Sequence, residues 1–128
     1  MNKPTTNPPI KTFEDACKAL SISETLPDVS NIPAEFSKSI IAFYKLCIIA
    51  KALNGEWIPD LLNSNQIKFY TYFYLDNGGV AGFAYRSSNI GLGLTYSHFV
   101  SRLCVKDRET AIFFGEQFEA IWKDYILG

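Results

Sequence analysis

The side chains best suited to binding chemistry are tyrosines in an alternating segment near the middle of the chain. Tyr70, Tyr72 and Tyr74 occupy every second position of residues 67–75, and Tyr85 follows in the next apolar segment. Alternation with a period of two is typical of a strand, so we expect these rings on one face of a sheet. Each ring combines an aromatic surface for stacking with a hydroxyl for hydrogen bonding.

Two arginines and two glycines would complete a site for a planar anion beside these rings. Arg86 and Arg102 are predicted at the rim of the sheet, where a guanidinium can pair with phosphate or carboxylate. Gly91 and Gly93 lie in a polar stretch, 87–95, that we predict as a loop, where glycine lets backbone N–H groups approach a ligand. The candidate ligand-binding residues are therefore Tyr70, Tyr72, Tyr85, Arg86, Arg102, Gly91 and Gly93.

Two alternatives to a ligand site stay open for the tyrosine face. The last helix of the chain could lie across the rings and make them part of the core. The face could also contact another protein, because interfaces favour Tyr, Trp and Arg. Two interpretations are also open for Trp57, which could cover the edge of the core or stack on a ligand.

No catalytic pattern accompanies these residues. His98 is the only histidine, and no motif links it to a nucleophile and an acid. Gly91-Leu-Gly93 lacks the third glycine and the following helix of a dinucleotide-binding loop. We therefore expect no enzyme and no cofactor.

The three cysteines, Cys17, Cys47 and Cys104, are widely spaced and form no CxxC pair. Because they lack the close spacing typical of zinc ligands and only one histidine could join them, we predict no metal. An odd number of scattered cysteines indicates free thiols in a reducing compartment.

The composition is typical of one folded domain with little net charge. The chain has 128 residues, of which 48% are hydrophobic, and its net charge is −1. This balance offers no excess of positive charge for a nucleic-acid backbone and so disfavours nucleic acid as a partner. The most apolar stretch, 40–50, is interrupted by Lys45 and is shorter than the about 20 residues of a membrane span. The start of the chain lacks an apolar signal region, so we expect no membrane association.

The pattern of elements predicts an α+β fold. We expect an extended N-terminal arm over residues 1–10, which carry three prolines, and a single α+β domain over 11–128. Its sheet is a small antiparallel one of three strands, a hairpin plus one strand, packed with about three helices in the order α-α-β-β-β-α. The predicted elements are a helix over 13–20 capped by Thr12, a helix from Pro33 to Leu53, strands over 67–75, 80–86 and 99–106, and a final helix capped by Asp107.

Two local patterns in these elements carry further predictions. Asn77-Gly78 is typical of a two-residue hairpin turn, which would pair Leu75 with Val80 and Tyr70 with Tyr85. The long helix is apolar on most sides, so we place it centrally. Its main predicted stripe comprises Phe36, Ile40, Phe43, Tyr44, Cys47 and Ala50.

Five stretches of the chain carry a resemblance to a known family: 10–20, 44–54, 57–59, 101–104 and 115–124. Together they resemble a family of short, uncharacterised proteins from phages and mobile elements of gut Bacteroidota, crAss-like phages included. The family's first strand usually contains a proline that is absent from residues 68–73 here, so we expect a more regular strand. The resemblance implies a viral or prophage setting and carries over no catalytic residue.

These observations lead to two expectations for function. The first is a non-catalytic, phage-encoded binding module in the host cytoplasm, which sequesters a small nucleotide-like ligand or blocks a host protein and so acts against host defence. The alternative is a structural or accessory protein of the virion. The expected partners are a host or phage protein or a small planar anionic ligand, with a homo-oligomer as a further option.

Overall fold

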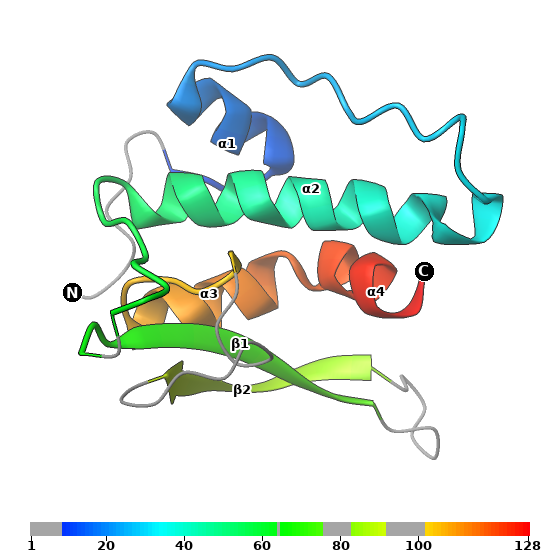
Figure 1. Cartoon of the computed structure of the whole chain (residues 1–128). Helices are drawn as coiled ribbons and strands as arrows, with labels where there is room; N and C mark the ends of the chain where they lie inside the picture. Colours follow the sequence, from blue (N-terminus) through cyan, green and yellow to red (C-terminus); the bar gives the residue numbers. More distant parts are fainter. Residues whose placement is uncertain (1–8, 64, 76–82, 92–101) are drawn as a thin grey trace.

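The computed structural model describes residues 9–63, 65–75, 83–91 and 102–128, with only the backbone for 74, 75 and 83–91. The elements in these ranges are α1 (Phe13–Leu20), α2 (Ala34–Asn54), β1 (Lys68–Leu75), β2 (Phe83–Gly91), α3 (Arg108–Gln117) and α4 (Glu119–Leu127). Figure 1 shows α2 as the long central helix, with α1 along one side of it. Helices α3 and α4 lie on the other side of α2, between it and the β1–β2 hairpin.

The predicted α+β fold with a three-stranded sheet is wrong. The described residues are mostly helical and form four helices, while their sheet has two strands. The third strand was expected over 99–106, but residues 102 and 103 form a turn and Val105 pairs alone with Phe69. An isolated bridge pairs only one residue with one partner. A short apolar run such as 103–105 is compatible with either a bridge or a strand, so the sequence could not distinguish the two.

The predicted register of the hairpin is also wrong. Leu75 pairs with Phe83 rather than Val80, and Tyr70 pairs with Asn89 rather than Tyr85. The register shifts between Tyr72 and Phe73, because Arg86 of β2 has no partner in the pairing, while β1 itself runs unbroken from Lys68 to Leu75. The Asn77-Gly78 turn lies outside the described residues. Residues 87–91, predicted as a loop, belong to β2, because cross-strand pairing accommodates polar residues that local propensity assigns to a loop.

The predicted ends of the first two helices are largely confirmed. The Thr12 hydroxyl accepts a hydrogen bond from the Asp15 N–H at 3.0 Å, which satisfies one of the free donors at the start of α1. Gly55 ends α2 with a φ of 60°, a left-handed value that favours glycine. Pro33 precedes α2 as its N-cap instead of forming its first turn.

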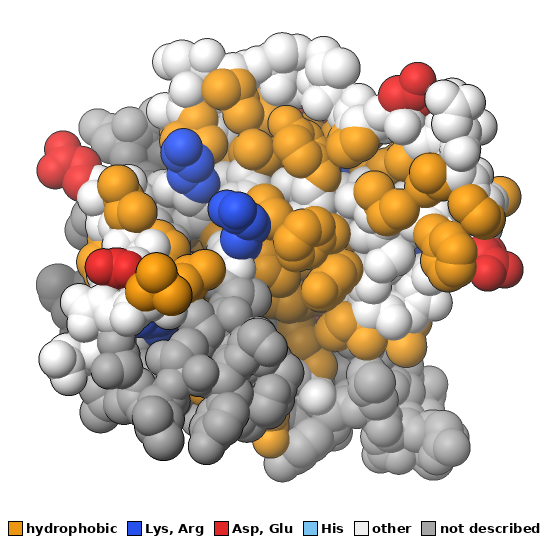
Figure 2. All heavy atoms as spheres, in the orientation of Figure 1, with side chains coloured by type: hydrophobic (Ala, Val, Ile, Leu, Met, Phe, Trp, Pro, Cys, Tyr) orange, Lys and Arg blue, Asp and Glu red, His pale blue; other side chains and the backbone are white. Residues whose placement is uncertain are grey.

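The buried stripe of α2 differs from the predicted one. Leu46, Ile49 and Leu53 are fully buried, whereas Phe36 and Ile40 are exposed. The helix is apolar on most sides, so its sequence could not tell which side the core would cover. Figure 2, which has the orientation of Figure 1, shows hydrophobic side chains over much of the middle of the visible face.

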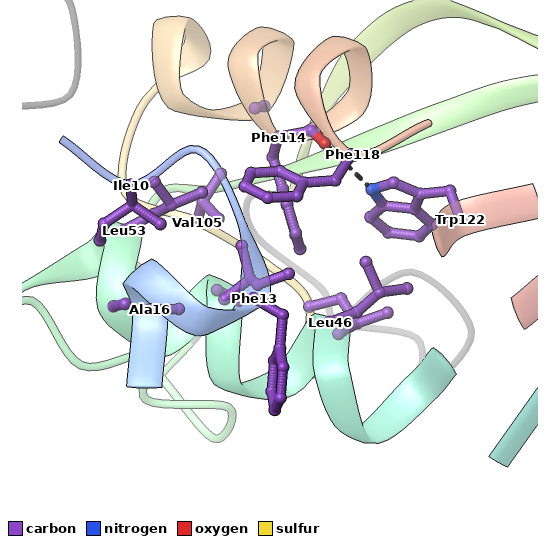
Figure 3. Packing of buried hydrophobic residues seen from close by; sticks show 14 of the residues in the cluster. Ile10, Phe13, Ala16, Leu46, Leu53, Val105, Phe114, Phe118 and Trp122 are labelled. Atoms are coloured by element: carbon purple, nitrogen blue, oxygen red, sulfur yellow. Dashed lines mark hydrogen bonds between the residues drawn. The ribbon is translucent and has the colours of Figure 1, made fainter. Parts of the chain in front are cut away.

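The core lies between α1, α2 and the two C-terminal helices. Figure 3 shows Phe13 and Ala16 of α1 on one side of Leu46 and Leu53, with Phe114, Phe118 and Trp122 on the other. Ile10, from the predicted arm, is also buried in this cluster, and residues 1–8 of the arm lie outside the described residues.

The predicted final helix is two helices that meet at Phe118. Asp107 caps α3 as expected, because its carboxylate accepts from the Thr110 N–H at 2.8 Å. Phe118 has φ −112° and ψ 28°, outside the helical region, and it separates α3 from α4. Beyond this break the Trp122 indole N–H donates to the Phe114 carbonyl at 3.2 Å, which ties the two helices together (Figure 3).

Phe118→Ala is expected to reduce the free energy of unfolding by about 3–5 kcal/mol, because it leaves a cavity beside Phe114. The neighbouring exposed variant Glu116→Ala serves as the control, with an expected loss below about 0.5 kcal/mol. Urea denaturation measures both. Equal stability of the two variants would contradict this assignment of the core.

Candidate functional site

The two predicted tyrosines of β1 lie on the sheet face that points away from the helices. The alternating residues between and beside them face inward: the Thr71 hydroxyl donates to the Ala111 carbonyl at 2.9 Å, and the Phe73 ring lies 5.3 Å from that of Trp122. The last two helices therefore cover Thr71 and Phe73 and leave Tyr70 and Tyr72 on the opposite face. Tyr72 is exposed, and partial burial raises the pKa of the Tyr70 hydroxyl.

The other predicted site residues are dispersed along β2 and beyond it. The backbone pairing sets Tyr85 against Phe73 and Gly91 against Lys68, which are five residues apart along β1. Arg86 lies between the residues paired with Tyr72 and Phe73, where the register shifts. Gly93 lies outside the described residues. The register thus does not make Tyr85 a cross-strand partner of Tyr70 or Tyr72.

Arg102 instead lines a groove beside the C-terminal half of α2. The groove has a volume of about 430 Å³ and runs between α2 and the loop 55–61. One wall is formed by Cys47, Ile48 and Lys51 of α2, and the opposite wall by Trp57, Ile58, Pro59 and Leu61. Among the described residues, Tyr70 and Tyr72 do not line it.

The loop wall of this groove is held by hydrogen bonds that close the loop on itself. The Gln66 side-chain amide donates to the Ile58 carbonyl at 2.9 Å and accepts from the Asp60 N–H at 2.6 Å. Buried Lys68 donates from its ammonium to the carbonyls of Asn63 at 2.9 Å and Gln66 at 3.2 Å. These bonds fix a segment that has no helix or strand of its own, so Trp57 and Ile58 are presented on an ordered wall.

The segment that carries Arg102 is held by Asn54, the last residue of α2. Asn54 is only 3% exposed. Its side chain donates to the Cys104 carbonyl at 3.2 Å and accepts from the Lys106 N–H at 3.0 Å. The amide thereby pairs with both backbone groups as a neighbouring strand would, and places the 102–106 segment against the end of α2.

The charges at the groove are mainly positive and mix with apolar walls. Arg102 and Lys51 are both exposed, and Glu56 is the one acid among the described lining residues. Burial raises the pKa of the Cys47 thiol, while the positive charge of Arg102 opposes that rise. A thiol with a raised pKa is protonated at neutral pH, so Cys47 is suited to packing rather than to nucleophilic attack.

This arrangement can bind a molecule that is partly flat and apolar and partly anionic. The half-buried indole of Trp57 offers a stacking surface, and Arg102 and Lys51 offer donors to an anion. Sequence reasoning named Arg102 and the stacking option for Trp57 but missed Lys51, Ile58 and Asn54. Nothing in the sequence indicated that Asn54 makes long-range contacts, because Asn-Gly is also typical of an ordinary helix end.

No protein-family model, curated protein or solved structure matches the chain. Of the helices in the described part of the chain, none combines the length and apolar character needed to cross a membrane. Within the same ranges, no three His, Cys, Asp or Glu side chains cluster so that they could hold a metal ion.

Asn54→Ala is expected to lower the free energy of unfolding by about 2–4 kcal/mol, because it removes the buried hydrogen bonds to the Cys104 carbonyl and the Lys106 N–H. The exposed residue Asn31 provides the matched control, and Asn31→Ala should melt close to the parent chain. Thermal unfolding followed by circular dichroism compares the two. A small effect of both substitutions would show that Asn54 does not anchor the 104–106 segment.

Arg102→Gln is expected to slow the alkylation of Cys47 by iodoacetamide at about pH 8. Loss of the positive charge lets the pKa of Cys47 rise further, so the thiolate fraction at a fixed pH falls. Peptide mass spectrometry measures the rate at Cys47 separately from Cys17 and Cys104. Lys123→Gln, a change to an exposed α4 residue that does not line the groove, should leave the rate unchanged. An equal or faster rate in Arg102→Gln would contradict the interaction.

Proposed function

We propose that the chain is a non-catalytic binding protein of a phage or mobile element that acts in the host cytoplasm. Its ligand is a small, nucleotide-like molecule with a planar part and an anionic part, bound in the groove between α2 and the loop 55–61. The observation that carries this proposal is the convergence of Trp57, Lys51 and Arg102 on one apolar groove. The phage setting follows from the sequence resemblance alone.

The size and the walls of the groove both support a small ligand. A volume of about 430 Å³ lies within the roughly 300–1,000 Å³ typical of small-molecule sites. Such sites combine mostly apolar walls with a few polar groups that orient the ligand. Ile48, Pro59 and Leu61 provide apolar wall here, and the two cations lie beside it.

The chemistry of the lining selects the ligand class. An indole stacks on any flat ring, so it favours planar ligands without specifying which ring. A guanidinium and an ammonium on the same groove favour phosphate or carboxylate. The ligand class is therefore the one expected from the tyrosine face, but its position differs, because Arg102 lies in this groove.

Adenosine monophosphate is a suitable probe, with uncharged adenosine as its matched comparison. We expect calorimetry to show binding of the monophosphate, and expect about tenfold weaker binding for adenosine and for Arg102→Ala, because each loses the charge-assisted contact. Trp57→Leu should weaken both probes by removing the stacking surface. Lys123→Ala is the charge-matched control and should bind like the parent chain. No binding, or equal binding by Arg102→Ala and Lys123→Ala, would contradict the proposal.

Fractionation of infected cells tests the setting of the proposal. A host-cytoplasmic binding protein is expected in the soluble lysate and not in purified particles. Recovery in particles at the abundance of other virion proteins would instead support the structural or accessory role in the virion.

A further inference from the structure

Helix α2 carries an apolar stripe that the rest of the domain leaves accessible. Phe36 is 50% exposed and Ile40 is 41% exposed, although both are large hydrophobic side chains. Phe43 and Cys47 continue the line and are half-buried. We call these four residues, Phe36, Ile40, Phe43 and Cys47, the outward stripe. Their successive spacings of four, three and four are those of a seam that packs against another helix.

The neighbouring helices contact the borders of the stripe without covering all of it. On one side, Phe13 of α1 contacts Tyr44, with ring centroids 6.3 Å apart. On the other side, Tyr125 of α4 contacts Phe43 at 5.4 Å. The exposed residues lie toward the N-terminal end of α2, where the segment 21–33 that joins α1 to α2 has no helix or strand (Figure 1).

Charge is distributed unevenly along this face. Its C-terminal end meets the groove, where Lys51 and Arg102 are exposed and Glu56 is the one acid among the described lining residues. The stripe itself contains no charged residue. A partner that covers the stripe therefore meets an apolar surface along most of its length and positive charge at one end.

We propose that the outward stripe docks an amphipathic helix of another protein, antiparallel to α2 and with acidic residues in its first turn. An antiparallel helix begins where α2 ends, so its first turn lies beside Lys51 and Arg102. Acidic residues are favoured in a first turn by the helix dipole, and here they also meet the two cations. Apolar side chains three and four residues apart along that helix then pack on the stripe as far as Phe36.

A synthetic peptide of about 18 residues, or five turns, provides the probe. It carries glutamates in its first turn and leucines three and four residues apart, and a matched peptide replaces the glutamates with lysines. Fluorescence anisotropy with the full chain should show binding of the acidic peptide. The basic peptide should bind about tenfold more weakly. A double variant, Lys51→Glu with Arg102→Glu, should reverse this preference.

Ile40→Ser should weaken the acidic peptide by about tenfold. Because Ile40 is already partly exposed, the variant should keep the melting temperature of the parent chain. Leu62→Ser, which alters an exposed leucine that is 97% accessible, is the control for general hydrophobicity and should bind normally. Equal binding by these two variants, or equal binding of both peptides to the parent chain, would overturn the proposal.

Two further measurements separate this surface from other occupants and from the small-ligand proposal. Sedimentation that showed a dimer of the parent chain and a monomer of Ile40→Ser would assign the stripe to a second copy instead. Ile40 does not line the groove, so Ile40→Ser should bind adenosine monophosphate normally. Failure of the nucleotide to bind therefore leaves helix docking intact, and failure of the peptide leaves the nucleotide proposal intact.

Discussion

The side chain of Asn54 joins two parts of the molecule that lie 50 residues apart in the chain. Asn54 is the last residue of the central helix, and its side chain forms hydrogen bonds with the Cys104 carbonyl and the Lys106 N–H. That segment in turn pairs with β1, because Val105 and Phe69 exchange two backbone hydrogen bonds of 2.7 and 3.0 Å. One buried amide therefore connects α2 to the hairpin, and Arg102 reaches the groove because its segment is held at this place.

The position of this segment also explains why one side of α2 is buried in the core and another stays accessible. Helices α3 and α4 follow directly after the anchored segment and pack on the side of α2 that contains Leu46 and Ile49, while α1 packs on another side. Three helices cannot surround a fourth over its whole length when one of them has eight residues. Part of an almost uniformly apolar helix consequently stays accessible, and it adjoins the groove that carries Trp57 and Arg102.

Both proposals assign the groove and the outward stripe to binding through shape and charge, without a reaction at side chains of the protein. Cys47 lies in the groove, but burial keeps its thiol protonated. The ordered wall of the loop depends on backbone carbonyls and on the Gln66 and Lys68 side chains, so these polar groups are occupied in holding structure. In the two proposals, the groups that meet the ligand or partner are an indole, a guanidinium and an ammonium, which suit a flat anion or an acidic helix end.

Local signals determined the elements whose ends depend on nearby residues. Thr12 and Asp107 cap their helices, and Gly55 ends the long helix, because each of these contacts closes within a few residues. Tertiary structure decided the strand register and the single bridge at Val105, since each depends on partners that are distant in the chain. It also decided the site: the residue types for binding a planar anion were evident in the sequence, but Arg102 joins Trp57 rather than the tyrosines because Asn54 anchors its segment beside α2. No local pattern could reveal this contact, since an Asn before a Gly serves equally well as an ordinary helix end.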